Sequence, residues 1–164
     1  AEDGIRDSWA SRGLGDVYKR QLFALKKRDT KNSFILLSRS LQSIKKYIQT
    51  LSLSDESLLN NTWPGPVTFV IKYNNAIPEH LKNDTGKLAF RVSNHYPIKA
   101  LLKDFDGLFA STSANISGEP ILQFPQEIID IFANDNLAYY DEKLGKEMKP
   151  STIIDLETKK ILRH

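Results

Sequence analysis

The 164-residue sequence contains no cysteine and only three histidines. Without cysteine the chain has no disulfide framework and no thiolate zinc site. His80, His95 and His164 lie far apart in the sequence and match no metal-binding spacing such as HExxH. The sequence therefore predicts a protein without a built-in metal centre.

Long apolar runs are also missing. None approaches the ~18 residues needed to cross a bilayer, and no stretch has the charged, apolar and small-residue order of a secretory signal. The apolar fraction of 40% and the charged fraction of 26% are typical of a soluble globular domain. We therefore expect a cytoplasmic protein with a buried hydrophobic core and no membrane partner.

The net charge at pH 7 is only +3, but the positive charges are concentrated in one stretch. Between residues 22 and 50 a single acidic residue, Asp29, stands against seven cations: Lys26, Lys27, Arg28, Lys31, Arg39, Lys45 and Lys46. Such a cluster is typical of a solvated helix face, and also of a patch that binds the phosphates of ATP or of nucleic acid. Charge alone does not separate these interpretations.

Hydrophobic periodicity predicts strands and helices in irregular alternation. The expected strands are residues 34–37, 68–73, 88–92, 107–110, 137–140, 152–156 and 160–162. The expected helices are residues 22–28, a helix from Ser38 or Ser40 to about Leu51, a helix that begins at Ser54 or Asp55 and ends at the WPGP segment 63–66, a turn at 77–78, and residues 96–105 and 125–132. We therefore expect an α/β (α+β) fold, a single domain with a twisted mixed β-sheet flanked by helices.

Residues 1–21 fit neither kind of pattern. The stretch has no sustained period, and it is similar to translated adaptor sequence. We expect it to be foreign to the domain, which would then comprise residues 22–164.

Residues 111–120, with the sequence STSANISGEP, form a polar loop after an apolar segment. Small hydroxyl and amide side chains at the end of a strand suit a site that hydrogen-bonds a ligand. Ser113 and Asn115 are also residue types that form turns by bonding to the neighbouring backbone. Both interpretations of this loop stay open.

Four pieces occur in a fixed order: Lys26-Lys27-Arg28, the WPGPVT segment 63–68, Arg91-Val92 and residues 111–120. Together with the PSTIID segment 150–155 they resemble the YrdC family of L-threonylcarbamoyladenylate synthases, from about residue 22 to residue 163. The resemblance implies a YrdC-like domain and a nucleotidyltransferase that makes threonylcarbamoyl-AMP and pyrophosphate from L-threonine, bicarbonate and ATP. The product is the donor for threonylcarbamoyladenosine in tRNA, which implies a downstream tRNA threonylcarbamoyl-transferase machinery as partner.

The resemblance also implies roles for individual residues. Lys26 and Arg28 are the catalytic cations, because threonine carbamate and ATP are both anions whose repulsion must be offset. The nucleotide contacts are Arg28, Asn32, Asn115 and Ser151, and the threonine contacts are Arg91 and Ser113. Mg²⁺ on the phosphates of ATP accompanies this chemistry.

Each of these residues also has a structural interpretation. Lys26 and Arg28 suit the C-terminal end of a helix, where cations are favoured. Asn32 can stop that helix, Arg91 can be an outward residue of its strand, and Ser151 can cap a strand.

The family has a first strand and a PTDTxYGL segment upstream of Lys26, and residues 1–21 do not match them. We therefore expect a domain that lacks its first strand segment, and weak or no synthase activity from this chain. The alternatives are a module that binds tRNA or double-stranded RNA, and an inactive truncated remnant. A carbamoyl-transfer enzyme of hydrogenase maturation would carry zinc-binding cysteines, which are absent.

Overall fold

The computed structural model describes residues 20–27, 34–122, 124–132 and 150–163. These residues belong to two compact units that are interleaved along the chain. The larger unit contains residues 34–77, 82–112 and 150–163, and the smaller unit contains residues 20–27, 78–81, 113–122 and 124–132. Within the described ranges, no helix combines the length and the apolar character that crossing a membrane requires.

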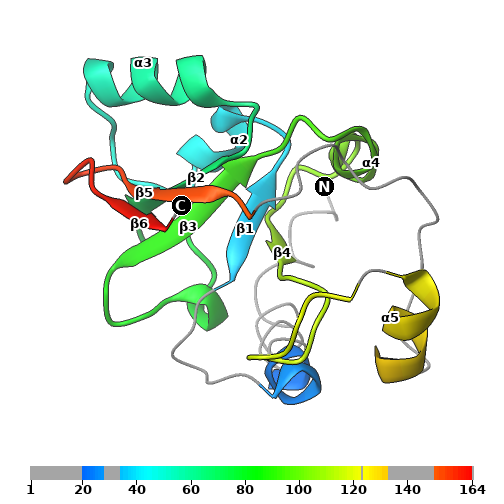
Figure 1. The fold of residues 1–164 in the computed structure, drawn as a ribbon. Coiled ribbons are helices and arrows are strands. Elements are labelled where there is room, and N and C mark those ends of the chain that lie inside the picture. Colours follow the sequence, from blue (N-terminus) through cyan, green and yellow to red (C-terminus); the bar gives the residue numbers. More distant parts are fainter. Residues whose placement is uncertain (1–19, 28–33, 123, 133–149, 164) are drawn as a thin grey trace, which may run out of the picture. The chain divides into compact units, whose positions relative to one another are not determined.

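The larger unit is built on a six-stranded sheet in the order β4-β1-β3-β2-β5-β6 (Figure 1). The strands are β1 (Ile35–Ser38), β2 (Val67–Lys72), β3 (Lys87–Val92), β4 (Phe109–Ser111), β5 (Thr152–Asp155) and β6 (Ile161–Arg163). β1 runs parallel to β3 and β2 to β5, whereas the other three neighbouring pairs are antiparallel. The mixed sheet predicted from the sequence is confirmed, and the strand expected at 137–140 lies outside the described residues.

Helices belong to both units. In the larger unit they are α2 (Leu41–Lys45), α3 (Leu53–Thr62) and α4 (Tyr96–Leu102). In the smaller unit they are a helical segment at residues 20–26, the 3₁₀ turn η1 (Glu79–Leu81) and α5 (Pro125–Phe132). The prediction for α5 is confirmed, with proline in the first turn where its missing N–H costs nothing.

The predicted end of α2 is wrong. Ser40 caps the helix, as one of the two expected residues, but the helix ends at Lys45 and does not continue to Leu51. Beyond it the chain turns extended, because Ile48 forms an antiparallel bridge with Tyr73 after β2. A long-range pairing therefore overrides the helical spacing of the local sequence.

Other helix boundaries also differ from the prediction. The segment predicted at 22–28 is helical over residues 20–26, with Lys27 in a turn. α3 begins at Leu53 because Ser52, and not Ser54 or Asp55, is the capping residue, with its Oγ accepting the N–H of Asp55 at 3.0 Å. α4 ends at Leu102, three residues before the predicted end. All three serine and aspartate residues at the start of α3 are good caps, so the local sequence does not choose among them.

One face of the sheet carries the core of the larger unit. Phe69 of β2 and Phe90 of β3 face each other in the register and are 1% and 0% exposed. Trp63, which follows α3, packs edge-on against Phe69 with ring centroids 5.5 Å apart. Leu59 of α3 is also fully buried. The end of α3 therefore covers this face of the sheet.

The other face is polar at both ends of the strands. Successive strand residues point to opposite faces, so Thr68 and Lys72 of β2 lie on the face opposite to Phe69. In the β2–β3 register Lys72 lies opposite Lys87, at the start of β3. Continuing the same register one residue past the Phe69–Phe90 pair places Thr68 opposite Arg91. Arg91 and Thr68 thus mark one end of this face, and the two lysines mark the other.

Candidate active site

In the smaller unit a buried lysine organises the serine-rich loop. Lys26 lies at the end of the helical segment 20–26 and is 3% exposed. Its Nζ donates hydrogen bonds to the carbonyl oxygen of Ser113, to the carbonyl oxygen of Asn115 at 2.6 Å and to Asn115 Oδ1 at 3.1 Å. An ammonium has three protons, and these three loop oxygens match them. A buried charge is tolerated only with such partners.

Ser113 and Asn115 are hydrogen-bonded within the same loop. The Ser113 hydroxyl donates to Asn115 Oδ1 at 2.6 Å, and Asn115 Nδ2 donates to the carbonyl oxygen of Glu119 at 2.6 Å. The backbone N–H of Ser117 donates to the carbonyl oxygen of Lys26 at 2.9 Å, which ties the loop to the end of the helical segment. The structure therefore brings together Lys26, Ser113 and Asn115, with the two loop side chains making turn-forming bonds.

Arg28 and Asn32, the other predicted residues of this region, lie outside the described residues. Their assigned roles therefore remain predictions.

In the larger unit Arg91 is anchored to the WPGP segment. Its half-buried side chain leaves β3, and its Nε donates to the carbonyl oxygen of Gly65 at 3.0 Å. The N–H of Gly65 donates in turn to the carbonyl oxygen of Val92 at 2.9 Å. No functional role was predicted for Gly65 from the sequence, where the WPGP segment served only as a helix end and as one of the family motifs.

Ser151 is buried at the start of β5, and its contacts are also polar. Its Oγ lies 2.8 Å from Thr68 Oγ1, and Arg163 Nη2 donates to its carbonyl oxygen at 2.9 Å. Thr68 lies opposite Arg91 in the β2–β3 register and contacts Ser151. Ser151 and Arg91 therefore lie at the same end of the sheet. No site role was predicted for Thr68 or Arg163 from the sequence: Thr68 lies in the WPGPVT motif and in an expected strand, and Arg163 directly follows an expected strand.

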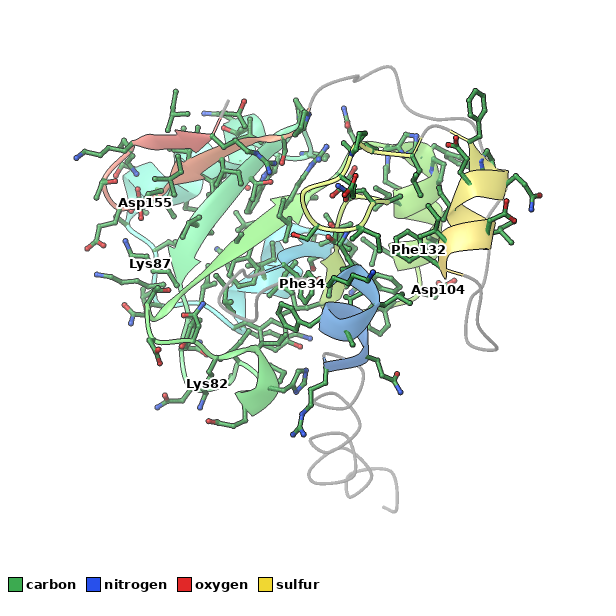
Figure 2. The ribbon with its side chains drawn as sticks, turned by 60° about the horizontal axis from the view of Figure 1, so that its bottom comes forward. Phe34, Lys82, Lys87, Asp104, Phe132 and Asp155 are labelled. Carbon is green, nitrogen blue, oxygen red and sulfur yellow. The ribbon has the colours of Figure 1, made fainter. Side chains whose placement is uncertain are left out.

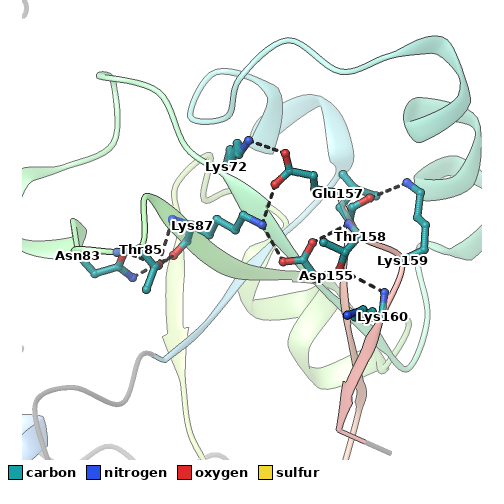
Figure 3. Close-up of polar contacts among 10 residues, drawn as sticks. Lys72, Asn83, Thr85, Lys87, Asp155, Glu157, Thr158, Lys159 and Lys160 are labelled. Atoms are coloured by element: carbon teal, nitrogen blue, oxygen red, sulfur yellow. Dashed lines mark hydrogen bonds and ion pairs between the residues drawn. The ribbon is translucent and has the colours of Figure 1, made fainter.

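At the opposite end of the same face, an ion-pair network connects β2, β3, the last residue of β5 and the turn after it (Figures 2 and 3). Lys87 Nζ lies 2.8 Å from Asp155 Oδ2 and 2.9 Å from Glu157 Oε2, and Lys72 pairs with Glu157 at 2.6 Å. A depression of about 260 Å³ opens beside this network, with Asp55 also in its wall. These charges neutralise one another, which indicates a structural role for the network.

The network shifts the titration of its members. Hydrogen bonds to Asp155 and then to Glu157 raise the pKa of Lys87. Burial raises the pKa of Asp155, but hydrogen bonds from Lys87 and from the Thr158 backbone N–H together outweigh it, so this pKa lies below its ordinary value. The raised pKa of Lys87 and the lowered pKa of Asp155 both favour the charged ion pair at neutral pH.

Most described cations of the basic stretch have acidic partners from elsewhere in the larger unit. Arg39 and Lys46 pair with Asp106 at 3.2 and 3.1 Å, and Lys45 pairs with Glu56. The hydrogen bond to Asp106 raises the pKa of Lys46. The positive charge of residues 39–46 is therefore largely neutralised locally, which weakens the case for a nucleic-acid-binding patch there.

Comparison with known proteins assigns the chain to a family. The family model Sua5_yciO_yrdC, described as "Telomere recombination", matches residues 15–164. The chain belongs to this family. The resemblance to the YrdC family, drawn from the four sequence motifs, is thereby confirmed. The match begins inside the stretch 1–21, whose foreign character stays a prediction.

Individual relatives agree with this assignment. A threonylcarbamoyl-AMP synthase of Chromobacterium violaceum is 32% identical over 144 residues, which are 88% of this chain and 74% of that protein. Its counterpart in Thiobacillus denitrificans is 32% identical over 144 residues, or 88% of this chain and 76% of that protein. The crystal structure of P. abyssi Sua5 complexed with L-threonine superposes with a TM-score of 0.75 at 25% identity, over 84% of this chain. The match spans only 41% of the Sua5 chain.

Proposed function

We propose that this chain is a threonylcarbamoyl-AMP synthase, a nucleotidyltransferase that uses L-threonine, bicarbonate and ATP. The observation that carries the proposal is the 32% identity, over 88% of this chain, to proteins named for that activity. The L-threonine complex of the similar Sua5 protein supports L-threonine as a substrate.

In the proposed reaction the amine of L-threonine takes up the carbon of bicarbonate, with loss of water, to form a carbamate. A carbamate oxygen then attacks the α-phosphorus of ATP, and pyrophosphate leaves. Both reactants are anions, so fixed cations that offset their repulsion lower the barrier, and positioning supplies much of the rest. No protein nucleophile is needed.

We assign the two catalytic cations to Lys26, in the smaller unit, and to Arg28. Lys26 also holds the loop that presents Ser113 to the threonine and Asn115 to the nucleotide. The hydrogen bonds of Lys26 to the carbonyl oxygens of both residues support this role, because they place a positive charge in contact with the loop backbone at Ser113 and Asn115. Asn32 is a further proposed nucleotide contact.

In the larger unit Arg91 is the proposed partner of the threonine carboxylate, since a guanidinium can bind a carboxylate with two parallel hydrogen bonds. Ser151 is the proposed nucleotide contact. Its bonds with Thr68 and Arg163 support a polar environment at that end of the sheet.

The proposal includes further partners. Mg²⁺ would arrive on the phosphate oxygens of ATP, because the described residues contain no cluster of three or more acidic, histidine or cysteine side chains. The product would pass to an enzyme that transfers the threonylcarbamoyl group to tRNA, which fits a cytoplasmic location. The alternative of an RNA-binding module has less support, because the cations of residues 39–46 are paired with carboxylates.

The test is pyrophosphate release, measured with L-threonine, bicarbonate and ATP each omitted in turn. Release should require all three substrates, and mass spectrometry should identify threonylcarbamoyl-AMP. Calorimetric binding of L-threonine gives a readout that does not depend on turnover. Arg91→Gln should weaken that binding, whereas Lys99→Gln, which removes an exposed cation of α4, should leave it unchanged. A protein that neither binds L-threonine nor releases pyrophosphate would contradict the proposal.

A further inference from the structure

Both backbone polar groups of Gly65 are hydrogen-bonded to residues of β3. Its N–H donates to the carbonyl oxygen of Val92 at 2.9 Å, and its carbonyl oxygen accepts from Arg91 Nε at 3.0 Å. Gly65 is itself buried, although it lies in a loop. The carbonyl oxygen of Gly65 therefore binds the side chain of Arg91, while the N–H of Gly65 binds the backbone of the next strand residue, Val92.

The loop around Gly65 has little freedom to move. The N–H of Trp63 donates to the carbonyl oxygen of Leu59 at 2.8 Å, which joins the loop to α3. Trp63 Nε1 donates to the carbonyl oxygen of Val67 at 2.7 Å, and the Trp63 ring packs on Phe69. The loop is thus fixed at both ends, so its carbonyl determines where the Nε of Arg91 lies.

Glycine is required here by close packing. A Cβ on Gly65 would lie 2.5 Å from the backbone carbonyl oxygen of Thr62, closer than real Cβ atoms approach. Gly86, by contrast, has nothing within 4 Å of such a Cβ, and its requirement is a positive φ of 66°. A side chain at residue 65 must displace the loop, and with it the carbonyl that Arg91 binds.

We propose that Gly65 is a positioning residue for binding of the amino-acid substrate. Its carbonyl fixes the Nε of Arg91, which sets the plane of the guanidinium and hence the direction in which this planar group meets a carboxylate. A bidentate pair between guanidinium and carboxylate depends on that plane. The inference rests on the proposed function, in which Arg91 binds the carboxylate of L-threonine.

The experiment compares Gly65→Ala with Gly86→Ala in the full chain. Gly65→Ala should weaken calorimetric binding of L-threonine by about tenfold or more, because the displaced guanidinium loses the geometry for two parallel hydrogen bonds to the carboxylate, and the loss of one hydrogen bond to a charged group has an effect of this order. The KM for ATP should stay within about twofold, a split that general destabilisation would not produce. Gly86→Ala imposes left-handed backbone strain at the other end of the sheet. It should lower the melting temperature without changing the binding of L-threonine or the KM for ATP.

A second variant covers the case in which Gly65→Ala does not fold. Pro66→Gly removes the exposed ring that restricts the preceding Gly65 and adds no bulk. It should weaken L-threonine binding in the same direction, by a smaller factor. If both variants bind L-threonine like the wild type, the positioning role is overturned while the proposed function stands. If the wild type neither binds L-threonine nor releases pyrophosphate, the positioning role and the proposed function are both overturned.

Discussion

Replacing Lys26 with methionine tests whether the buried ammonium holds the serine-rich loop. The change removes three hydrogen bonds, to the carbonyl oxygens of Ser113 and Asn115 and to Asn115 Oδ1. Two of these acceptors keep a donor, because the Asn115 N–H bonds to the Ser113 carbonyl and the Ser113 hydroxyl bonds to Asn115 Oδ1. The part-buried carbonyl oxygen of Asn115 loses its bond to the ammonium, and a hydrogen bond to a charged group contributes about 1.5–3 kcal/mol.

Part of that loss is offset, because burying a neutral methionine side chain does not carry the desolvation cost of burying an ammonium. We expect the free energy of opening the loop to fall by about 2 kcal/mol, which raises the open population about thirtyfold. Amide hydrogen exchange measures this opening directly. The amides of Ser117 and Leu122, which donate to the carbonyl oxygens of Lys26 and Ala114, should exchange about thirtyfold faster, in proportion to the open population.

Lys27→Met is the matched control, since Lys27 is the next residue and is exposed. It should leave the exchange of both amides unchanged, and the amides of β2 and β3 serve as an internal reference in each variant. Equal exchange in Lys26→Met and Lys27→Met would refute the reasoning. The turn bonds of Ser113 and Asn115 would then be sufficient to hold the loop without the ammonium.

Two further predictions concern stability. Leu59→Ala should lower the free energy of unfolding by about 2–5 kcal/mol in urea titrations, because Leu59 is 0% exposed, whereas Leu53→Ala in the same helix, at a site 91% exposed, should change it by less than about 0.5 kcal/mol. A loss shared equally by both variants would contradict the assignment of Leu59 to the core. Because the pKa of Asp155 lies below its ordinary 3.8 in the folded state, its stabilising contribution is complete well above pH 3.8 and is lost as the pH falls through the folded pKa. In Asp155→Asn the free energy of unfolding should therefore fall less steeply as the pH drops below about 4. If the variant shows the same acid transition as the wild type, the ion pair between Asp155 and Lys87 does not contribute to the acid sensitivity of the fold.

Local sequence signals predicted the elements well where one signal dominated. The β-branched run of β2, the alternation in β3 and the proline at the start of α5 each indicated an element that the structure contains. The prediction was wrong where several local signals competed, as at the start of α3, where Ser52, Ser54 and Asp55 are all suitable caps. It was also wrong where a distant strand intervened, as in the early end of α2.

The candidate site was predictable in part. The motifs named Lys26, Ser113, Asn115, Arg91 and Ser151, and the family they indicated is confirmed. They did not reveal that the side chains of Ser113 and Asn115 bond to each other, or that Lys26 is enclosed by their loop. Those features depend on burial, which a run of small polar residues does not predict.

The family, the residue types available for chemistry and most of the strands can be predicted from the sequence, because motif order and side-chain periodicity are properties of the chain read in one dimension. Which of those residues contact one another depends on the three-dimensional fold. Lys26 reaches a residue 89 positions away, Ser151 reaches Thr68 across 83 positions, and Arg91 binds Gly65 across 26. In the larger unit, the contacts of Ser151 and Arg91 depend on the order and register of β3, β2 and β5, which local sequence patterns do not specify.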